Sequence, residues 1–424
     1  MSKLRINKQT KPGQEVVLVS IDSAKNENQA YCVLSNGQAE IPSFKFSNEH
    51  SGFVEFGAQI RAFASQHGKS QVWLGIESTS TYGKPLIHFA CQQGWEVRWV
   101  NPVHTYRMKE IHDNTPDKND AKDTYIISEL MSMGKLLQYN KRDTLSEELR
   151  SLHRHRHQLT KQLTQLCNRA ESLAAEAFPE LPKLVKRGLR SKTIWHILEH
   201  CPLPADILSK EESWLAERLK KASCGQFKGK RVKELINKAQ YSTGYCPNPI
   251  ATRQRFKGMA QQFHLLCRQV EECETQMEKL LKQDAFFAKW LEIKGLGAII
   301  LGGLIGEIGD IHAFDNVESL IKYAGFNLYS YQSGKYKGQH KVSKRGSRQL
   351  RRVCYLAAVS LSSNGRMLAQ WRAHYRDGLK KPGMVAMANL AKKFLRCVYG
   401  AWKNGQVLNP GLVAKTPKSE ENKQ

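Results

Sequence analysis

The stretch Glu15-Val-Val-Leu-Val-Ser-Ile-Asp22 is an apolar run rich in β-branched residues, and it ends on a carboxylate. A run of this kind is typical of a buried β-strand. Two later stretches also predict strands, Gln71 to Ile76 ending at Glu77, and Glu96 to Val100 ending at Asn101-Pro102. We therefore expect three strands whose last residues are polar.

Helical patterns separate these strands, at residues 52–65 and 82–92. Strands that alternate with helices favour an α/β layer fold with a largely parallel sheet. The first domain is expected to span residues 1–140, and residues 1–14 form a polar basic leader within it.

Four carboxylates stand out in this first domain. Asp22 and Glu77 close predicted strands, which is where α/β folds place chemistry. Asp117 and Asp120 lie three residues apart where a helix is expected to start, so they would share one face. Four close carboxylates need a counterion, and Mg²⁺ or Mn²⁺ is the hard cation that suits oxygen ligands and phosphodiester chemistry.

Each carboxylate also has an ordinary interpretation. An acidic residue at a strand end is usually just solvated, and acidic residues are favoured at helix N-termini. Asp123 is a further candidate ligand one helical step beyond Asp120. Spacing alone leaves both interpretations open.

From Leu145 the hydrophobic period changes to alternating steps of four and three residues, which runs to Ala177 with one polar break at Arg156. A second seam of this kind runs from Met259 to Leu280. Heptad seams predict two long helices that pair as a coiled coil, either within one chain or between two chains. Pro, Gly and basic residues between the seams indicate an accessory insert at about residues 179–255.

The sequence thus predicts an α/β domain, long coiled-coil helices in the middle and a mainly helical C-terminal domain. The expected boundaries are 1–140, 141–285, 286–410 and a disordered tail at 411–424.

The chain carries 65 Lys and Arg against 39 Asp and Glu, a net charge of +26. Residues 319–376 contain twelve Lys or Arg and no Asp or Glu. Such a field suits a polyanion, and nucleic acid is the expected partner. The candidate contacts in this stretch are Lys335, Lys337, Lys341, Lys344, Arg345, Arg348, Arg351 and Arg352.

A serine segment, Tyr329-Ser-Tyr-Gln-Ser-Gly334, lies inside this basic stretch and is expected to form a flexible loop before a helix. A serine surrounded by cations can attack a phosphate while Lys and Arg neutralise the developing charge. Ser333 is the candidate nucleophile and Ser330 the reserve. A simple turn at Ser333-Gly334 remains the plain alternative, because no neighbour is singled out as a general base.

Two histidines, His153 and His157, could share a helix face, but the arginines between them disfavour a metal and indicate a solvated or nucleic-acid-facing helix. The ten cysteines include no C-x-x-C pair, and no run reaches the roughly 20 apolar residues of a membrane span. We expect a reduced, soluble, cytoplasmic protein.

Several short motifs, taken in order, resemble the DEDD transposases of bacterial insertion sequences, a family that includes the Piv-type DNA invertases. The motifs are Ser20-Ile-Asp22-Ser-Ala-Lys25, Gly75-Ile-Glu77-Ser-Thr, Val100-Asn-Pro102, Asp117-Lys-Asn-Asp-Ala121, Ile293-Lys-Gly-Leu-Gly297, Gly306-Glu-Ile-Gly-Asp310, Tyr323-Ala-Gly-Phe326, Gln332-Ser-Gly334 and Val342-Ser-Lys-Arg-Gly-Ser-Arg348.

The resemblance implies an N-terminal domain similar to the RuvC resolvase of the RNase H-like fold, with Asp22, Glu77, Asp117 and Asp120 holding Mg²⁺. It also implies a C-terminal transposase domain in which Ser333 forms a phosphoserine link to DNA. Dimers or tetramers with composite sites are implied as well. Some members use a structured bridge RNA as guide. A bacterial protein associated with the nucleoid is also implied.

Three functions follow for testing. The first is a DNA transposase or site-specific recombinase that cuts and rejoins insertion-element DNA. The second is a metal-dependent hydrolytic nuclease or junction resolvase that uses the acidic residues alone. The third is a nucleic-acid-binding assembly factor without catalysis.

Overall fold

The computed structural model describes residues 11–77, 82–113, 120–138, 142–329, 332–333, 336–337 and 341–414. The chain divides into two compact units, residues 1–140 and 141–424. Each unit has hydrophobic cores of its own.

The first unit is built on a six-stranded mixed sheet of order β3-β2-β1-β4-β5-β6. Its strands are β1 (Val16–Asp22), β2 (Glu27–Leu34), β3 (Glu40–Ser47), β4 (Gln71–Glu77), β5 (Glu96–Val100) and β6 (Leu136–Gln138). The central strands β1, β4 and β5 are parallel neighbours, whereas β2, β3 and β6 pair antiparallel at the two sides.

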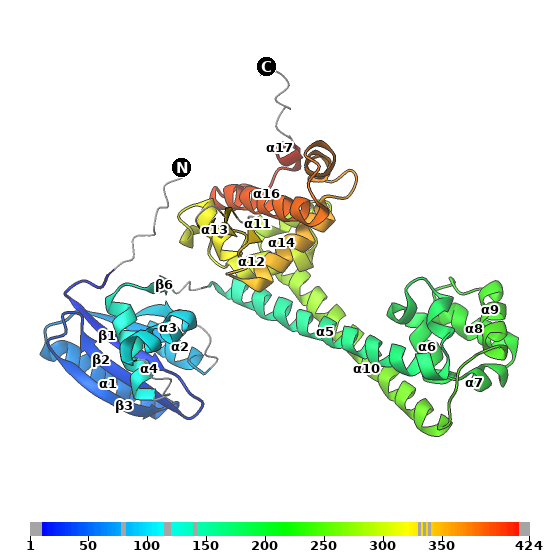
Figure 1. Cartoon of the computed structure of the whole chain (residues 1–424), viewed down its shortest axis with the longest axis horizontal. Helices are drawn as coiled ribbons and strands as arrows, with labels where there is room; N and C mark the ends of the chain where they lie inside the picture. The colour runs from blue at the N-terminus through cyan, green and yellow to red at the C-terminus, as the bar shows by residue number, and fades with distance from the viewer. Residues whose placement is uncertain are drawn as a thin grey trace, which may run out of the picture. The chain divides into compact units, whose positions relative to one another are not determined.

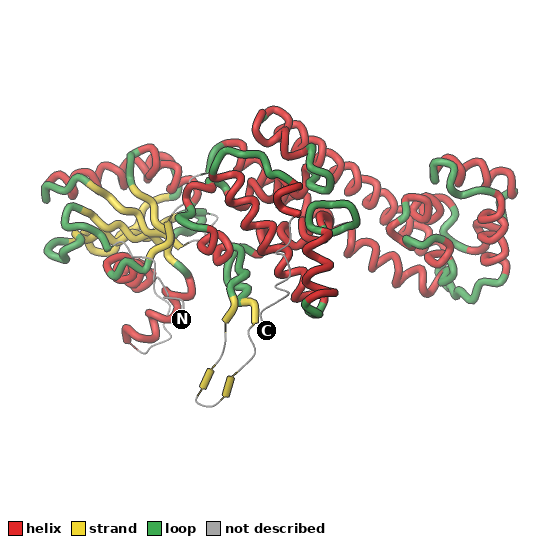
Figure 2. Tube along the Cα trace, turned by 90° about the horizontal axis from the view of Figure 1, so that it is seen from above, coloured by secondary structure: helices red, strands yellow, loops and turns green. Residues whose placement is uncertain are grey.

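Helices cover both faces of this sheet, because the buried central strands present apolar side chains to each face (Figure 2). Val17, Val19 and Ile21 pack against α1 (His50–Gln66) and α2 (Lys84–Gln92). Val16 and Leu18 face the opposite layer, where α4 (Asp120–Ser132) packs. This alternation follows from the two-residue side-chain period of a strand.

The mixed sheet with helices is consistent with a RuvC-like fold. The three strands that the sequence predicts are present and end at the expected residues. Strands β2, β3 and β6 were not anticipated.

The second unit contains two long helices, α5 (Thr144–Ala177) and α10 (Pro249–Gln283), which pack side by side within the chain (Figure 1). Leu149 near the start of α5 shares a core with Leu281 near the end of α10, so the helices run antiparallel. Arg156, the polar break of the predicted seam, pairs with Glu274 of α10 at 2.6 Å. The helices therefore form an intrachain hairpin.

The insert between these helices is a helical module with its own core around Trp195, Phe227 and Phe256. It comprises η1 (Leu181–Leu184), η2 (Gly188–Arg190), α6 (Lys192–His200), α7 (Pro204–Leu208), α8 (Glu212–Ala222) and α9 (Gly229–Gln240). Because α10 begins at Pro249, the boundary expected near residue 255 lies inside a long helix.

The C-terminal part is mostly helical. Its elements are α11 (Ala285–Leu291), α12 (Ala298–Ile308), η3 (Ile311–Ala313), α13 (Val317–Tyr323), α14 (Arg348–Leu361), α15 (Ala369–Ala373), the π-turn η4 (His374–Gly378), α16 (Gly383–Lys403) and α17 (Pro410–Ala414). Glycines let α12 lie directly against α5, since a Cβ at Gly306 would lie 2.5 Å from the Arg150 nitrogen.

The prediction of a disordered tail from residue 411 onward is wrong for residues 411–414, which belong to helix α17. Val413 in α17 is buried, and its carbonyl accepts a hydrogen bond of 2.8 Å from Trp371 Nε1. Apolar anchoring therefore orders the segment, and residues 415–424 lie outside the described part. No helix of the described residues is long and apolar enough to cross a membrane.

Candidate active site

The ends of strands β1 and β4 bring two of the predicted carboxylates to one edge of the sheet. Ile21 is opposite Ile76 in the parallel register, so Asp22 and Glu77 are the next residues on neighbouring strands. Both are only partly exposed. The β-strand geometry thus places two hard oxygen ligands side by side.

A third side chain fixes one of these carboxylates. Thr105 is buried in α3 (Pro102–Asp113), and its hydroxyl donates to Glu77 Oε1 at 2.5 Å. Asn101 Oδ1 accepts from the Val103 nitrogen at 3.0 Å, so Asn101-Pro102 starts the helix that carries Thr105. Thr105 was not anticipated, although it lies on the first turn after the Asn-Pro motif.

Asp120 is the first residue of α4, which packs against β1 and β2. Asp117 lies outside the described residues. Asp123 forms an ion pair with Lys109 of α3, so this alternative ligand has a cationic partner. In the part of the chain that the structure covers, Asp22, Glu77 and Asp120 do not form a group with ligand atoms within 4.8 Å of one another.

Three potential metal ligands do converge elsewhere. His196, Glu199 and His200 on α6 have ligand atoms within 4.8 Å of one another. These residues belong to the insert and not to the acidic edge of the sheet.

The segment that carries the candidate serine contains short strands, contrary to the flexible loop expected there. We call it the serine hairpin: β7 (Leu328–Tyr329) pairs with β10 (Lys341–Val342), and β8 (Gln332–Ser333) pairs with β9 (Tyr336–Lys337), both antiparallel. Figure 2 shows β7 and β10 leaving the helical body. Ser333 is opposite Tyr336, whereas Ser330 lies outside the described residues.

The base of the serine hairpin is held by a dense set of hydrogen bonds. The Ser347 nitrogen donates to the Tyr323 carbonyl at 2.7 Å, and Arg351 bridges the carbonyls of Ala324 and Lys344. Gly346 has φ +140°, and a Cβ there would lie 2.3 Å from the Tyr323 carbonyl oxygen. Only glycine fits this close approach.

A buried carboxylate lies beneath this base. Glu307 of α12 is fully buried and receives two hydrogen bonds from Arg154 of α5, at 2.7 and 3.0 Å. The Ser347 hydroxyl donates to Glu307 Oε2 at 3.3 Å, and the Tyr323 hydroxyl to the Glu307 carbonyl, also at 3.3 Å. Glu307 thus connects α5 to both ends of the serine hairpin.

Opposing effects act on this carboxyl. Burial raises the pKa of Glu307, but the hydrogen bonds and charge of Arg154, with Arg150 and His153, outweigh it and lower the pKa below its ordinary value. Glu307 is therefore ionised at neutral pH.

His153 of α5 lies in the same interior, which corrects the expectation of a solvated helix face. Its side chain is buried beside Gly303 of α12. Burial, with smaller contributions from Arg352 and Arg156, lowers the pKa of His153 to about 4. The imidazole is neutral at pH 7.

Cations surround the serine hairpin. Lys341, Lys344, Arg345 and Arg348 are exposed, while Arg351 and Arg352 are partly buried. The side chain of Lys337 and all of Lys335 lie outside the described residues. The described cations form a basic surface suited to phosphate.

Two family models match this chain. One, described as a transposase model of the DEDD type, matches residues 19–179, and the other, described as the transposase IS116/IS110/IS902 family, matches residues 289–376. Together they span more than half of the chain. The chain belongs to the IS110 family of transposases.

Sequence similarity to individual proteins supports the same assignment. The transposase is 22% identical to the insertion element IS900 uncharacterized 42 kDa protein of Mycobacterium paratuberculosis, over 94% of this chain and 98% of the relative. It is 23% identical to the insertion element IS110 uncharacterized 43.6 kDa protein of Streptomyces coelicolor, over 67% of this chain and 70% of the relative. A pilin gene-inverting protein of Moraxella bovis is 32% identical over 24% of this chain and 31% of its own length.

The protein is accordingly a DNA transposase or recombinase enzyme of an insertion sequence. The first matched segment contains all four predicted acidic residues, and the second contains Ser333. Residues 180–288, which comprise the insert, α10 and the start of α11, lie outside both matches.

Proposed function

We propose that this transposase cuts and rejoins the DNA of its insertion element through a phosphoserine intermediate on Ser333. The observation that carries the proposal is the pairing of Ser333 with Tyr336 in a hairpin whose base is fixed by Glu307, within an acid-free basic stretch. Because the residues at the foot of the hairpin are held in place, the hairpin can orient Ser333 as nucleophilic attack requires.

In the proposed step the Ser333 hydroxyl oxygen attacks a DNA phosphorus atom. One P–O ester bond to the DNA breaks as the Ser–O–P bond forms. The serine proton passes to solvent or a nearby base, and the released DNA oxygen takes up a proton to become a free hydroxyl end. The number of phosphate esters is unchanged, so rejoining needs no ATP. Lys341, Lys344 and Arg345 would neutralise charge on the phosphoryl oxygens.

The acidic edge fits a divalent cation. Asp22 and Glu77 are adjacent oxygen donors on rigid strands, and Thr105 orients Glu77. With Asp117 and Asp120 they would hold Mg²⁺ or Mn²⁺. A bound cation of this kind would polarise a phosphoryl oxygen as a Lewis acid.

Two partners belong to the proposal. Further copies of the chain would contribute to a composite site, as dimers or tetramers, through surfaces other than the α5–α10 seam, which is buried within the chain. A structured guide RNA would select DNA sites, as the resemblance implies. The alternative is hydrolysis by the acidic residues alone, favoured by the position of Asp22 and Glu77 at one sheet edge.

The test incubates purified protein with Mg²⁺, element-end DNA and any co-purifying RNA, followed by a denaturing gel. We expect a protein–DNA adduct that is lost in Ser333→Ala and in Asp22→Ala. Cleavage without an adduct that persists in Ser333→Ala and disappears in Asp22→Ala would establish the hydrolytic alternative. Strand exchange that survives excess chelator would contradict the metal part of the proposal.

A further inference from the structure

The insert carries a compact basic turn that neither family match covers. Between Glu180 and Glu199 the sequence has five Lys or Arg and no Asp or Glu. Four of them are exposed on residues 181–190, which we call the basic turn: Lys183, Lys186, Arg187 and Arg190.

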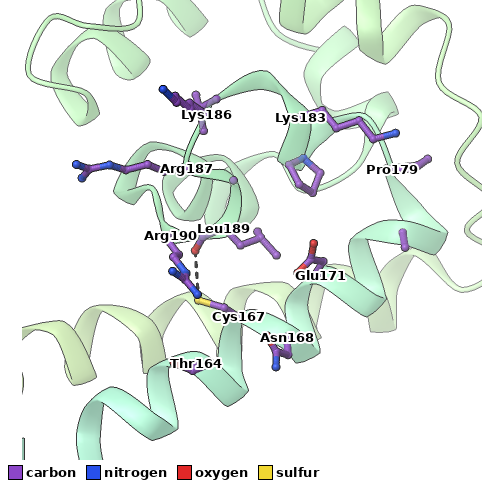
Figure 3. A pocket seen from close by; sticks show the side chains of 14 residues that line it. Thr164, Cys167, Asn168, Glu171, Pro179, Lys183, Lys186, Arg187, Leu189 and Arg190 are labelled. Atoms are coloured by element: carbon purple, nitrogen blue, oxygen red, sulfur yellow. Dashed lines mark hydrogen bonds between the residues drawn. The ribbon is translucent and has the colours of Figure 1, made fainter. Parts of the chain in front are cut away.

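The basic turn lies over α5 and encloses a pocket with it (Figure 3). The pocket has a volume of about 690 Å³, and all four cations line it together with Thr164, Asn168 and Glu171 of α5. In Figure 3, Arg190 reaches down toward α5 beside Cys167, while Lys186 and Arg187 extend from the upper part of the turn.

Buried contacts hold the backbone of the basic turn in place. Leu181, Leu184 and Leu189 are buried in the core of the insert. The Leu189 carbonyl accepts two hydrogen bonds, from Trp195 Nε1 at 2.6 Å and from Cys167 Sγ at 3.3 Å. The backbone that carries the four cations is therefore fixed before a ligand binds, which lowers the entropy cost of binding.

The charge of the basic turn is not balanced locally. None of its four cations forms an ion pair with any other residue in the described part of the chain, whereas neighbouring Lys192 pairs with Glu271 at 3.0 Å. The one carboxylate in the pocket is Glu171, on the α5 side. Like charges so close favour an anionic ligand with several negative groups.

We propose that the basic turn is a second nucleic-acid site, which binds the phosphodiester backbone without reading bases. Exposed Lys and Arg on a fixed turn contact phosphates, and the pocket offers hydroxyl and amide groups but no stacked aromatic platform among its lining residues. The basic turn shares no residue with the serine hairpin or the four acidic positions, and the inference does not depend on the proposed chemistry.

The test measures binding of the full chain to a labelled 30-base-pair DNA duplex and to a labelled 30-nucleotide single-stranded RNA, in EDTA so that no cleavage occurs. Arg187→Gln with Arg190→Gln is the pocket variant. Lys220→Gln with Lys221→Gln, at the exposed end of α8, removes the same charge elsewhere in the insert.

We expect the pocket variant to lose affinity by roughly tenfold or more at 0.1 M salt, and the slope of log K against log salt to fall by about 1.5 to 2. The α8 variant should stay within about twofold of wild type. The probe that loses affinity identifies the ligand as DNA, RNA or either.

Two further variants, each of which removes a negative charge, test whether affinity rises when repulsion of the ligand is reduced. Glu171→Gln should raise affinity by roughly twofold to threefold because it removes repulsion from the pocket, while Glu217→Gln in α8 should leave affinity unchanged. Equal losses in both arginine and lysine variants, or a wild-type salt slope in the pocket variant, would overturn the proposal. Circular dichroism melts of each variant establish that it folds.

Discussion

Thr105 donates its hydroxyl proton to the carboxylate of Glu77. A threonine hydroxyl has one proton, and the shortest of its contacts is the one to Glu77 Oε1. The bond leaves the second Glu77 oxygen for other partners and fixes the rotamer of the carboxylate. Partners of this kind usually change metal affinity or activity tenfold to a hundredfold in order of magnitude.

We predict that Thr105→Val raises the Mg²⁺ concentration needed for half-maximal DNA cleavage by roughly tenfold, because the isosteric side chain cannot orient Glu77. Thr105→Ser keeps the hydroxyl and should stay near wild type. A magnesium titration of cleavage rate measures both. An unchanged midpoint in Thr105→Val would mean that the bond only stabilises the fold.

The sequence pointed to Asp22 and Glu77 because a strand end is visible in a local pattern. Thr105 and Glu307 were missed as functional residues, since their partners lie far along the chain: Arg154 is 153 residues from Glu307. His153 was misjudged because its arginine neighbours suggested solvent, although α12 covers it with glycines. Asp117, Ser330 and the side chain of Ser333 lie outside the described residues, so their roles stay predictions.

The serine hairpin is the element on which the proposed chemistry depends. Its described strands are short, and they contribute few backbone hydrogen bonds of their own. Its orientation relative to the helical body therefore depends on the base, where Ser347, Tyr323 and Arg351 make their contacts. Disturbing the base should affect the chemistry more than it affects the stability of the unit.

We predict that Gly346→Ala lowers adduct formation at least tenfold, because its Cβ has no room beside the Tyr323 carbonyl. Gly365→Ala is a matched control, since Gly365 also has a positive φ, +72°, but nothing lies within 4 Å of its Cβ. The control should cost about 1 kcal/mol from backbone strain and keep adduct formation. Equal losses in the two variants would point to backbone strain alone.

Elements with strong apolar patterns were predictable, and those with mixed patterns were not. Strands β1 and β4 are nearly continuous apolar runs buried on both faces, and β5 keeps a shorter pattern in which Val97 and Val100 are buried. By contrast, β3 contains Pro42 and polar residues, and only Phe46 of its eight residues is buried, because the strand lies at the edge of the sheet. The two heptad seams predicted α5 and α10, but the choice of an intrachain hairpin depends on contacts between distant segments.

At the scale of the whole chain, the α5–α10 hairpin joins two separate cores within the unit of residues 141–424. Its one end packs with α12 and α14 in the C-terminal core, and its other end belongs to the core of the insert. Buried Glu307, which is paired with the half-exposed Arg154, and neutral His153 lie beside the first of these. Changing the charge of a buried group is costly, so both groups should make this unit sensitive to acid.

The lowered pKa values of His153 and Glu307 both make the unit less stable as the pH falls. His153 has its pKa lowered from 6.5 to about 4, so its contribution to stability is complete above pH 6.5 and is lost as the pH falls toward 4. The lowered pKa of Glu307 adds a loss that begins only below its ordinary value of 4.5. Between pH 6.5 and 5 the loss therefore belongs mainly to His153, and His157 on the same helix, whose pKa burial also lowers, adds to it in the same direction.

We predict that lowering the pH from 7.5 to 5 costs this unit about 2 kcal/mol through His153, since each pKa unit corresponds to about 1.4 kcal/mol. His153→Gln should remove most of this pH dependence, whatever its effect on stability at pH 7.5. His155→Gln, on the exposed face of the same helix, should preserve it. Denaturant unfolding followed by hydrogen exchange of peptides from α5 and α12 measures the difference, and an equal pH dependence in the two variants would show that other groups bind the protons.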